Sequence, residues 1–213
     1  MGPVHELTAL LAHLPGLGPR QARRVVQYLL KKNKTFRAEL SELIAQLADH
    51  TAECSLCHRY DDPHSSGTCG QCRSAARDTG TLVVVEHDVD IDAVEASGAY
   101  AGRYFVLGGL MPLSDRKRSQ AVHADHLVNR IKNEPIIEVI FALATTPEGD
   151  YTARELSKRL SEVNKKIKIT LLGRGLSVGA EVEYADPATL RHAPNSRAHA
   201  LSLPSPAPFA TRS

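Results

Sequence analysis

Thr81-Leu-Val-Val-Val-Glu86 is a continuous run of β-branched and aliphatic residues that ends in a carboxylate. Such a run suits a strand buried on both faces, as the central strands of a parallel sheet are. Similar apolar runs recur at residues 104–107, 136–143 and 167–172. Helical patterns lie between them at 123–132 and 152–160, the second predicted to begin at Thr152 as its N-cap. This alternation predicts an α/β fold, a mainly parallel sheet with flanking helices.

The N-terminal part, residues 1–53, has the apolar spacing of helices. Leu14-Pro-Gly-Leu-Gly-Pro19 separates two of these helical segments. Helix, Pro-Gly-x-Gly turn and helix is the layout of a helix–hairpin–helix element. Gly16 and Gly18 let backbone N–H groups converge at a helix N-terminus, where the helix dipole favours an anion of phosphate size. The alternative interpretation is a plain helical turn.

Basic residues cluster around this turn, although the net charge of the whole chain is only +2. Residues 17–37 contain seven Lys or Arg and no acid. Arg20 and Arg24 are four residues apart and share a helix face, and Arg23 flanks them. We predict sequence-independent, salt-sensitive binding to DNA phosphates, against the alternative of a solvated basic face. The predicted DNA-binding residues are Gly16, Gly18, Arg20, Arg23 and Arg24.

All four cysteines lie within residues 54–72, as the pairs Cys54/Cys57 and Cys69/Cys72. Two Cys-x-x-Cys pairs at this spacing are typical of a tetrahedral Zn²⁺ site. The segment has almost no aliphatic residues, so it needs another source of stability. We predict one structural zinc ion per chain, with no ligand position left open for catalysis. The alternatives are free thiols or two disulfides, and the nearby His58 and His64 are predicted not to be ligands.

Acidic residues follow two of the predicted strands. Glu86 ends the first strand, and Glu148 and Asp150 follow the strand at 136–143. Functional groups gather at the carboxyl ends of parallel strands. From the residues alone, these acids could hold Mg²⁺ or be plain surface acids.

Four further segments are expected to carry no chemistry. The aspartates at positions 88, 90 and 92 suit a solvated loop that enters a helix. His123 and His126 share a helix face and are expected to be surface residues, because no third ligand lies nearby in sequence. Residues 181–184 are expected to form a strand, and the Pro-, Ala- and Ser-rich residues 194–213 a disordered tail.

The order of these motifs resembles that of the RecR family of bacterial recombination mediators. The resemblance runs from about Leu7 to Asp186. It rests on the hairpin, the four-cysteine finger and Val83-Val-Val-Glu86, and then on three later segments. These are Tyr104-Phe-Val-Leu-Gly-Gly109, Thr146-Pro-Glu-Gly-Asp150 and the closing run at 174–186, which begins Arg174-Gly-Leu-Ser-Val-Gly.

The resemblance implies a domain organisation. The expected parts are a helix–hairpin–helix region (1–53), a zinc finger (54–72), a Toprim domain (80–172), a C-terminal segment (173–193) and the tail (194–213). It also implies a DNA clamp made of several copies, expected to be a tetrameric ring. Expected partners are RecO-type and RecF-type proteins, and the partner expected to dock on Glu86, Glu148 and Asp150 is the RecO-type protein. The expected role is loading RecA onto single-stranded DNA.

An enzyme of the Toprim class, such as a nuclease, primase or topoisomerase, is the competing hypothesis. Catalytic Toprim domains carry an Asp-x-Asp pair where this chain has Thr145-Thr-Pro-Glu148. This departure favours a protein without catalytic activity. No apolar run spans a bilayer and no signal peptide is apparent, so we expect a cytoplasmic protein associated with the bacterial nucleoid.

Overall fold

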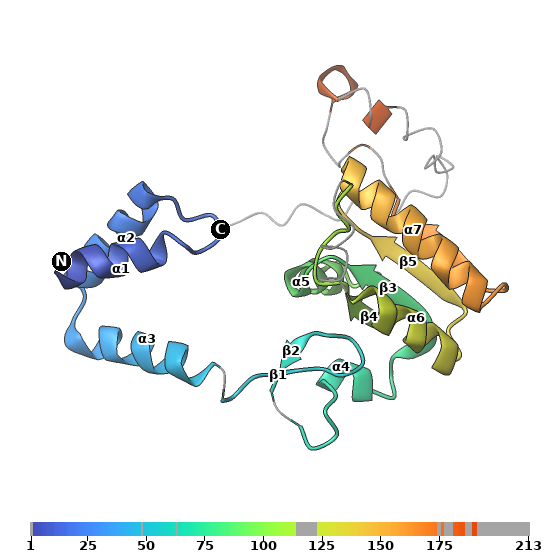
Figure 1. Cartoon of the computed structure of the whole chain (residues 1–213), viewed down its shortest axis with the longest axis horizontal. Helices are drawn as coiled ribbons and strands as arrows, with labels where there is room; N and C mark the ends of the chain where they lie inside the picture. Colours follow the sequence, from blue (N-terminus) through green and yellow to red (C-terminus); the bar gives the residue numbers. More distant parts are fainter. Residues whose placement is uncertain are drawn as a thin grey trace, which may run out of the picture. The chain divides into compact units, whose positions relative to one another are not determined.

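The computed structural model describes residues 2–47, 49–62, 64–113, 123–173, 176, 181–185 and 189–190 (Figure 1). Its chain forms two compact units. The helical unit comprises Met1–Ser55 with Tyr60–Cys69, and the α/β unit comprises Leu56–Arg59 with Gly70–Ser213. The chain therefore passes from one unit to the other more than once within the four-cysteine segment.

The helical unit contains α1 (Pro3–Leu11), α2 (Pro19–Lys31) and α3 (Lys34–Gln46). Proline stands at the start of α1 and of α2, where its missing N–H costs nothing. Asn33 caps α3 by accepting a hydrogen bond from the Phe36 backbone N–H. A short antiparallel pair follows, β1 (Ala52–Glu53) with β2 (Tyr60–Asp61). The predicted helical N-terminal part is confirmed.

The α/β unit is built on a four-stranded parallel sheet. In the order β4-β3-β5-β6, its strands are Gly102–Val106, Asp78–Val85, Glu138–Ala142 and Lys168–Leu171. The predicted central strand is β3, whose last four residues are all buried. Val85 pairs with Val106 on one side and with Ala142 on the other, so three strands end at one level of the sheet.

Helices cover both faces of this sheet, as Figure 1 shows. Helices α6 (Ala124–Asn133) and α7 (Pro147–Val163) pack on one face, around Leu82, Phe105 and Phe141. Helix α5 (Asp88–Ala96) lies on the other, where Ile91 is fully buried against Val83 and Val85. The one-turn helix α4 (Gly70–Arg73) precedes the sheet. The predicted α/β fold class is confirmed.

Three local predictions are wrong. Helix α7 begins at Pro147 with Thr146 as its N-cap, so Thr152 is not the cap but a buried residue inside the helix. Its hydroxyl donates to the Glu148 carbonyl and accepts from the Met111 N–H. Residues 182–184 form a 3-10 helix instead of a strand. Asp88 begins α5 instead of lying in a loop, and the predicted tail at 194–213 lies outside the described residues.

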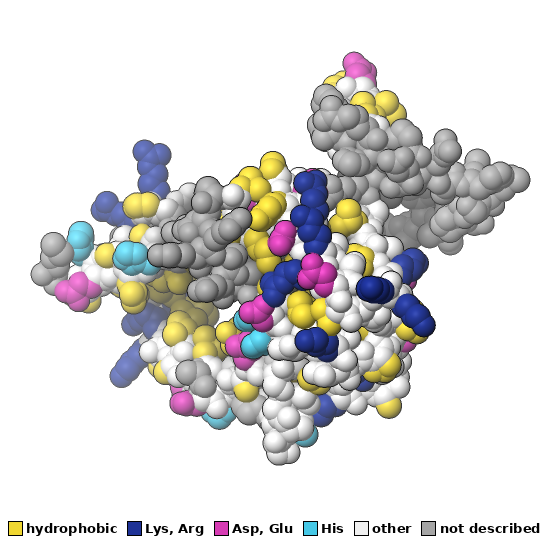
Figure 2. Space-filling model, turned by 45° about the vertical axis from the view of Figure 1, so that its right-hand side comes forward, with side chains coloured by type: hydrophobic (Ala, Val, Ile, Leu, Met, Phe, Trp, Pro, Cys, Tyr) yellow, Lys and Arg dark blue, Asp and Glu magenta, His cyan; other side chains and the backbone are white. Residues whose placement is uncertain are grey.

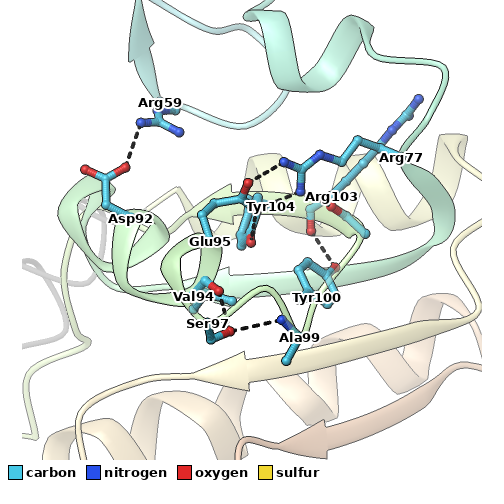
Figure 3. Close-up of polar contacts among 11 residues, drawn as sticks. Arg59, Arg77, Asp92, Val94, Glu95, Ser97, Ala99, Tyr100, Arg103 and Tyr104 are labelled. Carbon is cyan, nitrogen blue, oxygen red and sulfur yellow. Dashed lines mark hydrogen bonds and ion pairs between the residues drawn. The ribbon is translucent and has the colours of Figure 1, made fainter. Parts of the chain in front are cut away.

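A network of polar side chains joins α5 to the sheet (Figure 3). The Arg77 guanidinium donates two hydrogen bonds to the Glu95 carboxylate, at 2.7 and 2.5 Å. The Tyr104 hydroxyl donates to the same carboxylate. The hydrogen bonds from Arg77 lower the pKa of Glu95 to about 2, while burial raises the pKa of Tyr104. Glu95 therefore remains ionised in moderately acidic solution, where most carboxylates become protonated.

Gly149, in the first turn of α7, is required by a close approach of the backbone. A Cβ atom at this position would lie 1.9 Å from the Ala144 carbonyl oxygen. We expect Gly149→Ala to lower the free energy of unfolding by about 2–3 kcal/mol, because rigid backbone must move. Gly173→Ala is the control, since nothing lies within 4 Å of its Cβ position. Urea unfolding measures both, and equal midpoints for the two variants would contradict the prediction.

Candidate metal centre and nucleic-acid interface

The four cysteines come together as the predicted metal centre. Their sulfur atoms all lie within 4.8 Å of one another, and each cysteine is at most 7% exposed. None is in a disulfide, so that alternative is wrong. Four thiolates around Zn²⁺ at about 2.3 Å would have sulfurs about 3.8 Å apart, which fits this group. The Cys69 N–H also donates to the Cys54 sulfur, as outer-shell donors do at metal sites. The group can bind a metal ion.

A short segment, Leu56–Arg59, begins within the first Cys-x-x-Cys pair and belongs to the α/β unit; we call it the knuckle. The Cys57 carbonyl accepts from the Val106 N–H of β4 at 2.7 Å. The buried Arg130 guanidinium of α6 donates to the carbonyls of Leu56 and Tyr104. Strand β4 is at the edge of the sheet, so the knuckle covers part of an otherwise open edge.

Ion pairs also hold the knuckle to α5. The Arg59 guanidinium lies 3.1 Å from the Asp88 carboxylate and 3.0 Å from that of Asp92, and the second pair is drawn in Figure 3. Asp90 instead accepts from the His87 N–H at the start of α5. Asp92 is exposed, as predicted, but the prediction of solvated aspartates did not include these ion pairs. Their partner Arg59 is distant in sequence, so spacing alone could not show it.

The predicted DNA-binding turn forms the start of α2. Gly16 has φ +76°, a conformation that side chains disfavour, and Gly18 is the N-cap residue. No side chain caps this helix and its first turn contains no acid. Its leading backbone N–H groups therefore have no capping partner from a side chain, which suits an anion.

The arginines predicted to bind DNA are exposed, and all three lie on α2. Lys and Arg side chains project from the helical unit at the left of the space-filling view (Figure 2). Two other basic residues of the cluster have internal roles. Arg37 donates to the Lys32 carbonyl at the end of α2, and the Lys32 ammonium lies 4.7 Å from the centre of the Tyr28 ring. The arginines at the start of α2 are therefore candidates for anion binding, whereas Lys32 and Arg37 stabilise the helical unit itself.

The three predicted docking acids lie beyond the carboxyl ends of neighbouring strands. Glu86 follows β3, whereas Glu148 and Asp150 stand in the first turn of α7. There the helix dipole favours negative charge. Among the described residues, only two groups of three or more ligands converge within 4.8 Å, and neither contains these acids. The structure therefore gives no preformed Mg²⁺ site from them.

Sequence reasoning missed a contact between histidines. His58 of the knuckle lies against His123 and His126 at the start of α6. His126 is exposed and His123 half-buried, as expected of histidines near the surface, but His58 adds a third imidazole from a distant part of the sequence that the expectation did not include. The sequence held one indication of this contact. His58 directly follows the Cys54/Cys57 pair, and that pair fixes the position of His58.

The parallel sheet, with acidic residues beyond its strand ends, places the α/β unit in the class of Toprim domains. Residues 80–172 match the model of the Toprim domain family. Residues 175–193 match the family model described as RecR, C-terminal.

Whole-length relatives agree with these domain matches. The chain is 40% identical to "Recombination protein RecR" of Methylobacterium radiotolerans over 92% of this chain and 96% of that protein. It is 39% identical to the same-named protein of Bartonella bacilliformis and 37% identical to that of Cereibacter sphaeroides, with the same coverages. The chain belongs to the RecR family, as its sequence motifs predicted. Among the described residues, no helix is long and apolar enough to cross a bilayer.

Proposed function

We propose that this chain is a DNA-binding recombination mediator of bacterial DNA repair. Copies of it form a clamp on DNA and help RecO-type and RecF-type partners load RecA at single-stranded gaps in the cytoplasm. Membership of a family whose members are named recombination proteins supports the repair role. One structural observation carries the DNA contact: the uncapped, acid-free start of α2 with its exposed arginines.

The proposed DNA contact is to phosphates. The start of α2 offers backbone N–H groups and a positive dipole end, and Arg20, Arg23 and Arg24 add full charges. None of these groups needs a base edge as its partner. The clamp would therefore bind any sequence, as a mediator of repair at random sites must.

The proposed ion in the cysteine group is a single Zn²⁺. Four thiolates are soft ligands that select zinc over magnesium or calcium, and no open position remains for substrate. Its role would be structural, because the finger has little apolar core of its own.

The clamp needs copies of the chain to associate, and the helical unit has a surface suited to this. An apolar groove of about 600 Å³ runs between its helices, lined by residues such as Leu7, Leu29 and Ile44. Leu10, Leu43 and Leu47 are also exposed. In light scattering we expect a tetramer of about 92 kDa, four times the 23.1 kDa chain mass, for the free protein, and the same protein mass plus that of the DNA for the complex. A monomer under both conditions would contradict the clamp.

The acids at the strand ends are proposed to dock a basic partner protein of the RecO type. Carboxylates repel DNA phosphates, whereas a complementary basic surface speeds encounter and fixes orientation. Glu148 is half-buried at the start of α7, so its charge is held in a defined place.

Glu148→Lys tests this docking. We expect partner affinity to fall about tenfold or more, because an attractive charge becomes repulsive at a helix start. Glu162→Lys, on the exposed far part of the same helix, should leave the affinity unchanged. Calorimetry with the purified partner measures both, while zinc content and molar mass report on folding. Equal affinities for the two variants would remove the docking proposal.

The same acids make the enzyme alternative testable. With no preformed ligand group among them, Mg²⁺ would keep most of its water. Supercoiled DNA incubated with the protein and millimolar Mg²⁺ should remain intact. Nicking that disappears in Glu86→Ala would restore the enzyme hypothesis.

A further inference from the structure

Two exposed aromatic side chains stand where α2 is followed by α3 in the helical unit. Tyr28 of α2 is 53% exposed and Phe36 of α3 is 37% exposed. Their rings meet at an interplanar angle of 85° with centroids 6.4 Å apart, so the two form an aromatic corner. Aromatic side chains bury about 150–250 Å² each when they pack, so a pair left in solvent favours a ligand that covers it.

The aromatic corner is separate from the apolar groove proposed for association between copies. Val25 and Leu29 of α2 line that groove, whereas Tyr28 and Phe36 do not. Tyr28 instead shares a face of α2 with the exposed Arg24, four residues earlier. The aromatic corner therefore continues the surface on which the proposed phosphate-binding arginines lie.

Positive charge surrounds the aromatic corner. The Lys32 ammonium lies 4.7 Å from the centre of the Tyr28 ring and 5.6 Å from that of Phe36, so one cation holds both rings in place. Lys31 and Lys34 are exposed nearby in the chain, and neither α2 nor the first turn of α3 contains an acid. A ligand that combines negative charge with flat aromatic faces fits this surface, and nucleic acid has both.

The spacing along α2 suits a strand of DNA. A helix rises about 1.5 Å per residue, so Tyr28 lies about 6 Å along the axis from Arg24 and about 12 Å from Arg20. Successive phosphates of a stacked strand are about 3.4 Å apart along its axis. A strand held at the two arginines therefore reaches Tyr28 within about two to four nucleotides.

We propose that Tyr28, held by Phe36 and Lys32, is a stacking platform for unpaired bases, so that the helical unit prefers single-stranded DNA to duplex. This inference rests on the proposed DNA contact of α2 and goes beyond it, because phosphate contacts alone do not select unpaired bases. In a duplex, neighbouring base pairs cover the faces of each base, whereas a single strand can turn a base onto the ring. Every base has such a face, so binding stays independent of sequence.

The test measures binding of the full-length chain to a single strand, to its duplex and to an abasic strand of the same length, by fluorescence anisotropy. Tyr28→Ala should weaken binding to the single strand about tenfold, which is within the range for loss of one stacked base. It should leave binding to the duplex and to the abasic strand unchanged, because neither offers a base face. The salt dependence should also be unchanged, since no charge is removed.

Two further variants make the test specific to the ring. Tyr28→Phe keeps the ring and should bind the single strand as the parent does. Tyr184→Ala is the matched control, because Tyr184 is 79% exposed but follows Glu183 in the α/β unit. It should bind all three DNA molecules as the parent does, and an unchanged circular dichroism spectrum of each variant reports on folding.

Two results would overturn the platform and leave the phosphate contact of α2 in place. The parent could bind single strand and duplex equally well, or Tyr28→Ala could keep the parent's affinity for the single strand. Weaker duplex binding by Tyr28→Ala would also overturn it, and a lower molar mass in the same variant would assign Tyr28 to contacts between copies. A parent that binds no DNA would instead overturn the proposed DNA contact itself, and the platform with it.

Discussion

Replacing Cys69 by Ser should release the metal ion from the four-cysteine group and lower the melting temperature by about 10 °C or more. Cys69 is 1% exposed and its sulfur is one of the four that converge. Removing one thiolate leaves three buried ligands without a complete coordination sphere. Metal binding to such segments is folding free energy, so its loss would cost on the order of 4 kcal/mol or more.

The effect should reach beyond the finger itself. The knuckle contains Cys57, the second of the four cysteines, and it covers the edge of β4 through the Cys57 carbonyl. When the ion leaves, that hydrogen bond and the Arg59 ion pairs lose their fixed geometry. Limited proteolysis should therefore cut first within residues 54–72 and then more slowly in the α/β unit.

Gln71→Ser is the matched control, because Gln71 lies between the two cysteines of the second pair and supplies no sulfur. It should keep the metal and most of the stability. Elemental analysis and thermal unfolding followed by circular dichroism measure both proteins. A Cys69→Ser protein that melts with the parent, together with a parent that contains no metal, would contradict the account.

Replacing Arg20 and Arg24 by Ala should weaken DNA binding by about 10- to 100-fold for every sequence tested. Both side chains are exposed on the first two turns of α2, beside the uncapped N–H groups of that helix. Each arginine that no longer neutralises a phosphate also leaves one more counterion on the DNA. The slope of log affinity against log salt should therefore become shallower by about 1.8 units on duplex DNA, or about 1.4 on single strands.

Arg154→Ala with Lys158→Ala is the control for net charge. These residues are also exposed, basic and four apart, but they lie on α7. Fluorescence anisotropy across a salt series should show parent-like slopes for this pair of changes. If the α2 variant keeps the parent's affinity and slope, the phosphate-binding residues lie elsewhere.

The fold could be predicted where a pattern is local. The apolar run ending at Val85 forms the central strand, and the spacing of the four cysteines indicated their convergence. The start of α7 was misplaced because Thr146-Pro147 and Thr152 both satisfy capping rules. Thr146 is the actual N-cap because its hydroxyl accepts a hydrogen bond from the Gly149 N–H.

The parts that sequence could not predict depend on long-range interactions. Arg59 pairs with Asp92 across 33 positions, and His58 meets His126 across 68. Each side chain alone is typical of a solvated surface. Only the attachment of the knuckle to β4 brings them to their partners, and no periodicity in the sequence encodes that attachment.

Assembly of labelled RecA on gapped DNA coated with single-strand binding protein tests the central claim most directly. With a RecO-type partner from the same organism present, the parent chain should shorten the lag before filament growth. The Arg20→Ala/Arg24→Ala protein should leave most of that lag in place, while the Arg154→Ala/Lys158→Ala protein should act as the parent does. A lag that the parent chain does not change, or one that the α2 variant shortens equally well, would contradict the account of a DNA-binding recombination mediator.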